Sequence, residues 1–210
     1  MIRFIFLIAV ISLTACTTPS SLHKPVADPD KKWEQRKVEL SKINDWFLTG
    51  RVAIINGQES WHLTMEWQRH DDKYILDLSG PFGAGHAQLT GTNDGVILVD
   101  ADKNYFYADS PDHLLQEVTG VRMPVTSLMY WVSGLPNWNI NKEKQTLDEF
   151  GRLQQLQQDG WSVRFKRYID VNKHELPQKI FIDGHELKVK IFIDSWDLKS
   201  KNFKSIKEDS

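Results

Sequence analysis

The sequence of 210 residues predicts a mainly β fold of the α+β class. The expected architecture is an open, incomplete antiparallel β-barrel of about eleven strands, which encloses an apolar cavity and is covered by about three helices. Short segments alternate apolar and polar residues, as strands with one buried and one wet face do. Other segments follow the helical period. A sheet of that size must curl, so the helices can cover its concave side.

The N-terminus carries a pattern typical of export. Arg3 precedes an almost wholly apolar run, Phe4 to Leu13, and the small residue Ala15 precedes Cys16, the only cysteine. An apolar run of about ten residues is too short for a transmembrane helix, which needs about 20. We expect residues 1–15 to be a signal peptide. An ordinary secretory signal that ends on a cysteine by chance is the alternative.

The segment Leu13-Thr14-Ala15-Cys16 resembles the signal of bacterial lipoproteins. The resemblance implies cleavage before Cys16, an S-diacylglycerol on its thiol and an N-acyl chain on its new amine. Several acyl chains anchor a protein far more firmly than one. Thr17 rather than Asp follows the cysteine, which by enteric sorting rules favours the outer membrane of a Gram-negative bacterium, with the body facing the periplasm.

Composition indicates one domain and excludes some partners. Loss of the signal leaves 195 of the 210 residues, enough for a single core. The net charge is −2, or −3 without Arg3, so no field of one sign indicates a nucleic-acid partner. Eight Trp and ten Phe either fill the core or line a cavity. We expect a lipidated tether over 16–30, the domain over 31–200 and a polar tail over 201–210.

The first elements after the tether are a helix and a hairpin. Trp33, Leu40, Ile43 and Phe47 recur at roughly helical spacing, which predicts an amphipathic helix over about 30–44. The pattern then changes to a period of two. A hairpin is predicted from the strands Trp46–Ile55 and Trp61–Gln68, which the Asn56-Gly57 turn connects. Further short strands are predicted around Tyr74–Leu78, Ala87–Leu89, Val96–Asp100 and Tyr105–Tyr107.

Two helices interrupt the strands. Ser110-Pro111-Asp112 is typical of a helix start, and Gly120 of a helix end. A second helix is predicted over Pro124–Gly134, followed by a polar connector to about Glu149. The remaining strands are expected over Gly151–Gln157, Trp161–Phe165, Lys179–Ile182 and Leu187–Asp194.

The sequence shows no convincing active site. It lacks a Gly-x-Ser-x-Gly segment and a phosphate-binding loop, and its seven His include no His-x-x-x-His pair for a metal. The Gly80–Gly85 loop has enough glycine to cradle a phosphate, but it lacks a following helix and a Lys. We therefore expect neither catalysis nor a metal, and no cofactor besides the lipid on Cys16.

Phe82 stands at the tip of this Gly/Pro-rich loop. Its neighbours in the sequence are too small to bury it. Either the ring folds back under the sheet, or it forms an exposed apolar tip that meets a membrane or a partner.

The whole chain resembles the family of the outer-membrane lipoprotein receptor LolB. The order and spacing of several segments together carry the resemblance. These segments are Thr119-Gly120, Met123-Pro124, Thr126–Pro136, Pro81-Phe82-Gly83, Lys188–Trp196, Gly50-Arg51 and Trp67-Gln68.

The resemblance implies an open β-barrel closed by helices. It also implies a receptor that accepts lipoproteins from the periplasmic carrier LolA, shelters their acyl chains and inserts them into the inner leaflet of the outer membrane. The insertion loop would be Pro81, Phe82 and Gly83. Phe82 replaces the usual Leu of the family and remains apolar, so membrane insertion is expected to survive.

We expect a monomer whose cavity holds cargo acyl chains, although plain core packing would explain the same apolar residues. The expected lining residues are Leu63, Met65, Trp67, Leu76, Leu78, Leu89, Leu98, Leu128 and Trp131. The alternative function is a lipid-anchored protein of the same fold that binds another amphiphile, such as a glycolipid or phospholipid. A hydrolase with an apolar substrate site fits less well, because no nucleophile or metal cluster stands out.

Overall fold

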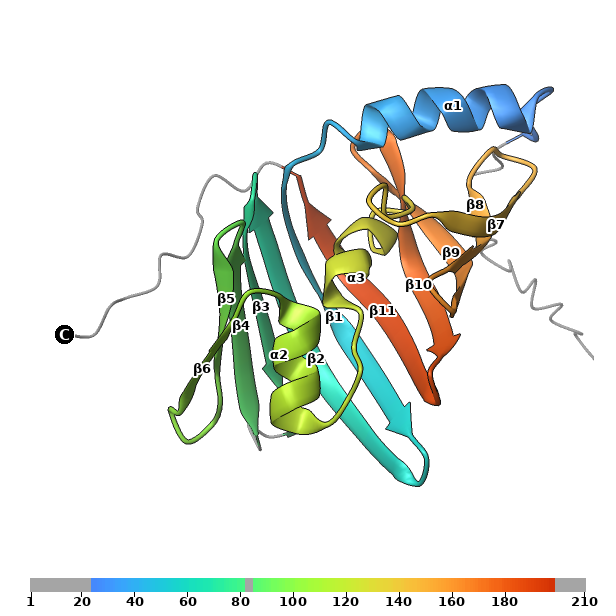
Figure 1. Cartoon of the computed structure of the whole chain (residues 1–210). Coiled ribbons are helices and arrows are strands. Elements are labelled where there is room, and N and C mark those ends of the chain that lie inside the picture. The colour runs from blue at the N-terminus through green and yellow to red at the C-terminus, as the bar shows by residue number, and fades with distance from the viewer. Residues whose placement is uncertain (1–23, 82–84, 199–210) are drawn as a thin grey trace, which may run out of the picture.

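Eleven antiparallel strands form one continuous curved sheet in the computed structural model, which describes residues 24–81 and 85–198 (Figure 1). The strand order is β6-β5-β4-β3-β2-β1-β11-β10-β9-β8-β7. Strands that follow one another in sequence are neighbours in the sheet, except β6 and β7, which lie at opposite edges. The first and last strands, β1 and β11, pair in the middle of the sheet. Within the described residues β6 and β7 are the two free edges, so the sheet is open. The predicted fold class is confirmed.

The strands are β1 (Asp45–Asn56), β2 (Glu59–His70), β3 (Lys73–Ser79), β4 (His86–Thr92), β5 (Gly95–Val99), β6 (Tyr105–Ala108), β7 (Lys142–Leu147), β8 (Leu153–Gln158), β9 (Trp161–Val171), β10 (His174–Gly184) and β11 (Leu187–Asp197). The helices are α1 (Pro29–Leu40), α2 (Pro111–Thr119) and α3 (Val125–Trp131). The predicted signal peptide and tail, and most of the tether, lie outside the described residues.

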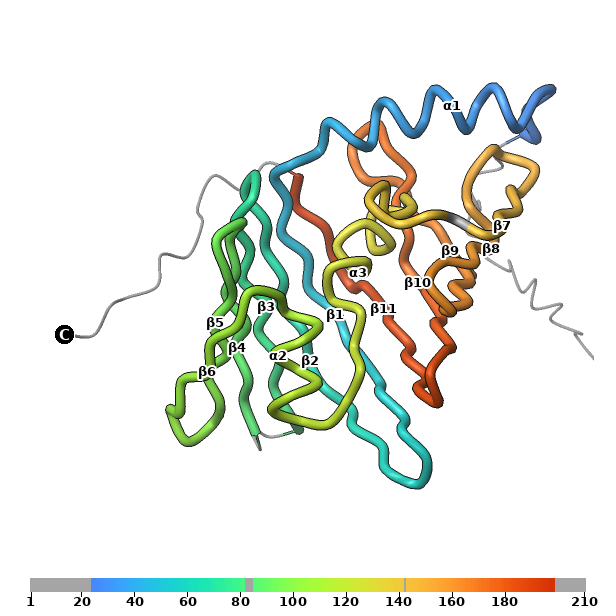
Figure 2. Tube along the Cα trace, viewed as in Figure 1, coloured from blue at the N-terminus to red at the C-terminus, as the bar shows by residue number. Residues whose placement is uncertain are grey.

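The chain crosses the open side of the sheet between its two edge strands. It leaves β6, forms α2 and α3 over the inner face, and continues to β7 (Figures 1 and 2). α2 packs on β5 and β6 and touches α3. The two short helices therefore act as a lid on the concave side, as the sequence predicts.

Two boundaries differ from the sequence predictions. α1 ends at Leu40 rather than near 44, because Ser41 caps it and Asp45 already pairs with His70 in the hairpin. Phe47, assigned by spacing to the helical stripe, lies in β1. The polar connector before Glu149 contains β7, which has a single neighbour, β8. An edge strand needs no apolar alternation, so its sequence gives no strand signal.

A charged network joins α1 to β10 and to the connection between β7 and β8. Arg36, in α1, lies 3.5 Å from the Glu175 carboxylate and also donates to the Glu175 carbonyl. Arg152 lies 2.7 Å from both Glu175 and Asp148. Nearby, the Val26 N–H donates to the Glu149 carbonyl at 3.0 Å. These contacts fix the point at which the N-terminal segment joins the body.

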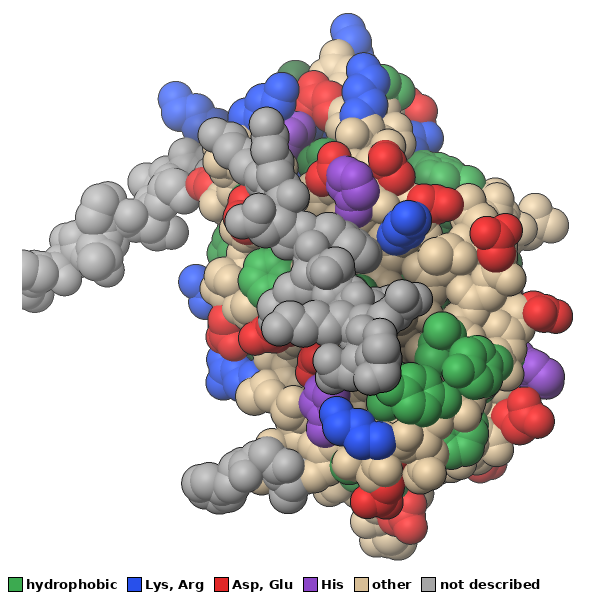
Figure 3. All heavy atoms as spheres, turned by 90° about the vertical axis from the view of Figure 1, so that its left-hand side faces the viewer, with side chains coloured by type: hydrophobic (Ala, Val, Ile, Leu, Met, Phe, Trp, Pro, Cys, Tyr) green, Lys and Arg blue, Asp and Glu red, His purple; other side chains and the backbone are tan. Residues whose placement is uncertain are grey.

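One side of the molecule shows charges of both signs. On the side that faces left in Figure 1, acidic and basic side chains are interspersed around a small apolar group (Figure 3). Within the described residues, no helix is long and apolar enough to cross a membrane.

Candidate functional site: an apolar cavity under the helical lid

An apolar cavity of about 290 Å³ lies between the inner face of the sheet and the lid. Among the residues that the structure describes, Thr119 is the only polar one in the lining. The lining residues are Val52, Ile54, Trp61, Leu63, Met65, Trp67, Leu76, Leu78, Ala87, Leu115, Thr119, Val121, Met123, Val125, Leu128, Val189 and Ile191. Such a lining offers no group for bond chemistry and suits a hydrocarbon.

The inward side chains of β2 run from the solvent-exposed mouth of the cavity to its buried floor. They become steadily more buried along the strand: Trp61 is 37% exposed, Leu63 is half-buried, and Met65 and Trp67 are 3% and 1% exposed. The strand can do this because alternate residues face the same side. The mouth therefore lies toward the Asn56-Gly57 turn, and Trp61 stands at it.

A carboxylate links the two helices of the lid. Asp112, in the first turn of α2, accepts hydrogen bonds from the backbone N–H of Thr126 at 2.8 Å and from its hydroxyl at 3.1 Å. This contact joins the start of α2 to the start of α3. Burial raises the pKa of Asp112 above its ordinary value, because the hydrogen bonds from Thr126 do not fully compensate for lost solvent.

A buried polar network closes the interior behind α3. Gln158 is fully buried and accepts from the Trp131 indole N–H at 3.1 Å and from the Asn137 N–H at 3.0 Å. Its amide donates to the carbonyls of Asn137 and Ile140 at 2.8 and 2.9 Å. Asn137 in turn donates to the Ser127 hydroxyl. Because all of these groups are satisfied, the network fixes α3 against β8.

The loop between β3 and β4 is clipped at its base. The Gly80 N–H donates to the Gly85 carbonyl at 3.0 Å, and Gly85 has a φ of +73°, which favours glycine. Pro81 is exposed. Phe82 and Gly83 lie outside the described residues, as does Cys16.

Comparison with known proteins decides the family. The sequence profile of "Outer membrane lipoprotein LolB" matches residues 44–196, which is most of the chain. The chain belongs to the LolB family. The outer-membrane lipoprotein LolB of Nitrosococcus oceani is 36% identical over 179 residues, covering 85% of this chain and 89% of that protein. LolB of Pseudomonas syringae is 37% identical over 174 residues, covering 83% and 84%. LolB of Pseudomonas putida is 39% identical over 153 residues, covering 73% and 74%.

Solved structures agree on the fold. A domain from Vibrio parahaemolyticus assigned to outer-membrane lipoprotein sorting matches with a TM-score of 0.56 at 12% identity, covering 84% of this chain and 96% of that one. A LolA superfamily protein from Nitrosomonas europaea matches with a TM-score of 0.52 at 6% identity, covering 83% and 93%. At these identities the similarity extends to the fold alone.

Six of the nine residues expected from the sequence of this LolB-family chain meet at the cavity: Leu63, Met65, Trp67, Leu76, Leu78 and Leu128. The other three do not line it. Leu89 and Leu98 pair with each other across β4 and β5 and lie buried in the core. Trp131 is fully buried, and its indole is directed to Gln158. These three side chains lie in the packed core and not at the cavity wall.

Sequence reasoning missed part of the cavity wall. Val121 and Met123 lie in the connection between α2 and α3, which carries no regular period. Ile54 and Val189 lie on strands that were recognised, and their alternation could have placed them on the inner face. The burial of Gln158 could not be expected, because it stands in a polar stretch, Leu153–Gln158.

Proposed function

We propose that this protein is the receptor that accepts lipoproteins from the soluble periplasmic carrier LolA and inserts them into the inner leaflet of the outer membrane. The apolar cavity with Trp61 at its mouth is the observation that carries the proposal. Membership of the LolB family supports it. The receptor would act as a monomer.

The energetics of transfer require such a cavity. Each CH₂ of an acyl chain exposed to water costs about 0.8 kcal/mol, so cargo needs a continuous apolar path. Transfer makes and breaks no covalent bond, and direction comes from increasing affinity along carrier, receptor and bilayer. The family is one of lipoprotein-binding proteins rather than of enzymes.

The described cavity is small for its proposed cargo. Its volume of about 290 Å³ is at the lower limit of ligand pockets, which range over about 300–1,000 Å³. We infer that α2 moves away from the sheet during loading, while the bond from the Trp131 indole to Gln158 keeps α3 in place. α2 is suited to such movement because it is short and packs mainly on β5 and β6.

The proposal assigns two further roles to residues outside the cavity. Lipid on Cys16 would keep the body near the target leaflet. The loop Pro81-Phe82-Gly83 would present an apolar side chain to the bilayer. The clip between Gly80 and Gly85 supports this role, because it holds the two ends of the loop together.

A transfer assay tests the proposal directly. The protein is mixed with LolA loaded with a radiolabelled lipoprotein, and cargo is followed from carrier to receptor and then to vesicles. We expect cargo to move in both steps without nucleotide. Cargo that stays on the carrier would reject the receptor function. Binding of glycolipid or phospholipid in the cavity without any cargo transfer would support the alternative, a carrier of another amphiphile.

Phe82→Glu separates the two steps of the assay. Uptake from LolA should persist, because the loop is not part of the described cavity lining. Insertion into vesicles should fall about tenfold or more, because a carboxylate is costly to bring into hydrocarbon. Val38→Glu is the matched control, since Val38 is 56% exposed on α1 and away from the loop. Equal insertion by both variants would remove the loop from the mechanism.

A further inference from the structure

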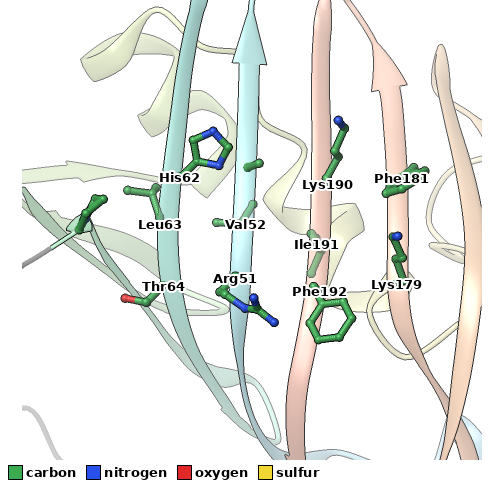
Figure 4. Close-up of a pocket in the computed structure, with 12 residues that line it drawn as sticks. Arg51, Val52, His62, Leu63, Thr64, Lys179, Phe181, Lys190, Ile191 and Phe192 are labelled. Carbon is green, nitrogen blue, oxygen red and sulfur yellow. The ribbon is translucent and has the colours of Figure 1, made fainter.

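The outer face of the sheet carries a second hollow, a groove of about 580 Å³ on the side away from the lid. It runs across β2, β1, β11 and β10 (Figure 4). The register of the strands places Arg51 beside Phe192 and Phe192 beside Lys179. In the next row Lys190 lies beside Phe181. Cations and aromatic rings therefore alternate on this surface.

Two of these cations are not neutralised. The Arg51 guanidinium lies 2.7 Å from the Asp194 carboxylate. By contrast, Lys179 and Lys190 are exposed and form no ion pair with any residue in 24–81 or 85–198. They are diagonal neighbours on β10 and β11, which places them about 7–8 Å apart at their backbones. The groove thus concentrates positive charge.

The aromatic rings give the groove an apolar floor. Phe181 and Phe192 are half-buried. The Lys179 ammonium lies 5.3 Å from the Phe181 ring centre, and the Arg51 guanidinium lies 4.8 Å from that of Phe192. Lysine stems lie along apolar surface while the ammonium stays in water. Such a surface suits a ligand with an anionic group joined to an apolar one.

The groove borders the loop that the proposed function directs to the membrane. Pro81 lines it. Ser79 pairs with Thr64, which also lines the groove, so the β3–β4 connection leaves the sheet at the groove edge. A membrane lipid is therefore the anionic ligand that this position favours over a free phosphate.

We propose that this groove binds the phosphodiester headgroup of an anionic phospholipid such as phosphatidylglycerol. Lys179 and Lys190 would contact the phosphate, and Phe181 and Phe192 the glycerol and upper acyl carbons. The assignment deepens the proposed function and rests on it for its purpose: the outer face would hold the target bilayer while the inner face holds cargo. Binding itself requires only the groove.

The test is vesicle flotation with the full chain carrying Cys16→Ala, so that the anchor does not dominate. Vesicles of phosphatidylethanolamine are used with and without phosphatidylglycerol, at an ionic strength of about 0.1 M, where the Debye length is about 10 Å. We expect Lys179→Gln/Lys190→Gln to bind phosphatidylglycerol vesicles about 20–30-fold more weakly, since each lysine near an anionic surface contributes about fivefold. Vesicles without phosphatidylglycerol should float little protein.

The control is Lys31→Gln/Lys173→Gln, which changes net charge equally. Both lysines are exposed, on α1 and in the β9–β10 turn, away from the groove. Binding should change less than about twofold, because charges more than a Debye length from the lipid are screened. Equal losses in both pairs, or no loss in the groove pair, would overturn the proposal.

Cargo uptake from LolA without vesicles gives the second measurement. The groove pair should take up cargo normally. Reduced uptake would instead assign the groove to a protein partner and overturn the lipid assignment. If the unsubstituted protein takes no cargo but its phosphatidylglycerol binding depends on Lys179 and Lys190, the receptor function fails and the groove assignment stands.

Discussion

The two ends of the interior are built differently on the same pair of strands. Toward α1, at the closed end, Trp46 packs edge-to-face on Trp67 and Trp196 with ring centres 5.5 and 5.7 Å apart. Leu48 is completely buried beside them. Toward the β1–β2 turn, at the open end, Leu63 lines a hollow and Trp61 is 37% exposed.

The difference shows how one sheet can be tightly packed at one end and enclose a cavity at the other. Large rings fill the closed end, so little empty volume remains there. Aliphatic side chains line the open end and leave space beneath a short lid. Stability should therefore be sensitive to the closed end, and cargo binding to the open end.

The strongest test of this comparison replaces one tryptophan at each end. Trp46→Ala should lower the free energy of unfolding by about 3–5 kcal/mol, because it removes a fully packed ring. Trp61→Ala should cost less than about 1 kcal/mol, because its ring is partly in water. Urea unfolding followed by circular dichroism measures both. Similar losses would mean that the mouth is as tightly packed as the closed end.

The polar network behind α3 should matter nearly as much. Gln158→Leu leaves the Trp131 indole N–H and the Asn137 N–H without their acceptor, so we expect a loss of about 2–4 kcal/mol in urea unfolding. Gln154→Leu is the control on the same strand, because Gln154 is exposed. A neutral Gln158→Leu would indicate that this network is not needed to hold α3.

Enlarging a side chain, rather than truncating it, also distinguishes the closed end of the interior from the open end. Leu48→Phe should cost about 1–3 kcal/mol, because the closed end has no space for a ring. Leu63→Phe should leave unfolding within about 1 kcal/mol, because the ring can enter the hollow. The latter variant should instead lower cargo uptake from LolA severalfold. Normal uptake by a stable Leu63→Phe protein would argue against acyl chains in this cavity.

The smallest effect concerns the carboxylate in the lid. Since the folded pKa of Asp112 is raised, the folded chain binds the proton more tightly than the unfolded chain, and its contribution to stability falls as pH rises from about 3.8 through the folded pKa. Asp112→Asn should remove this dependence while its side-chain oxygen still accepts from Thr126. We expect a gain under about 1 kcal/mol at pH 7, since lost charge-assisted bonds offset the relief. An unchanged pH profile of unfolding would contradict the assignment.

The sequence predicted those parts of the fold that depend on local periodicity. Trp61, Leu63, Met65 and Trp67 alternate without interruption, so β2 and its inward face could be recognised. β7 could not, because an edge strand with one neighbour is not required to bury alternate residues. The end of α1 was misplaced because Phe47 continues the helical spacing by coincidence.

Candidate sites were harder to predict where the pairing register of distant strands decides which residues line the site. Alternation gives the face of a strand but not the depth under the lid, so Leu89 and Leu98 were assigned to the cavity although they are core residues. The outer groove depends on the β10–β11 register. Lys179 and Lys190 are separated in sequence, and only that pairing makes them neighbours.

The hydrogen bond between Val26 and Glu149 limits how the body can stand on a membrane. About ten peptide units separate Cys16 from Val26, and a fully extended segment of that length reaches about 35 Å at most. β1 alone, with 12 residues, is about 40 Å long. A lipid on Cys16 would thus keep Val26 within about 35 Å of the membrane surface. A body that leans over, with the long outer face of its sheet near the lipid, needs far less of that reach than one standing upright with α1 uppermost.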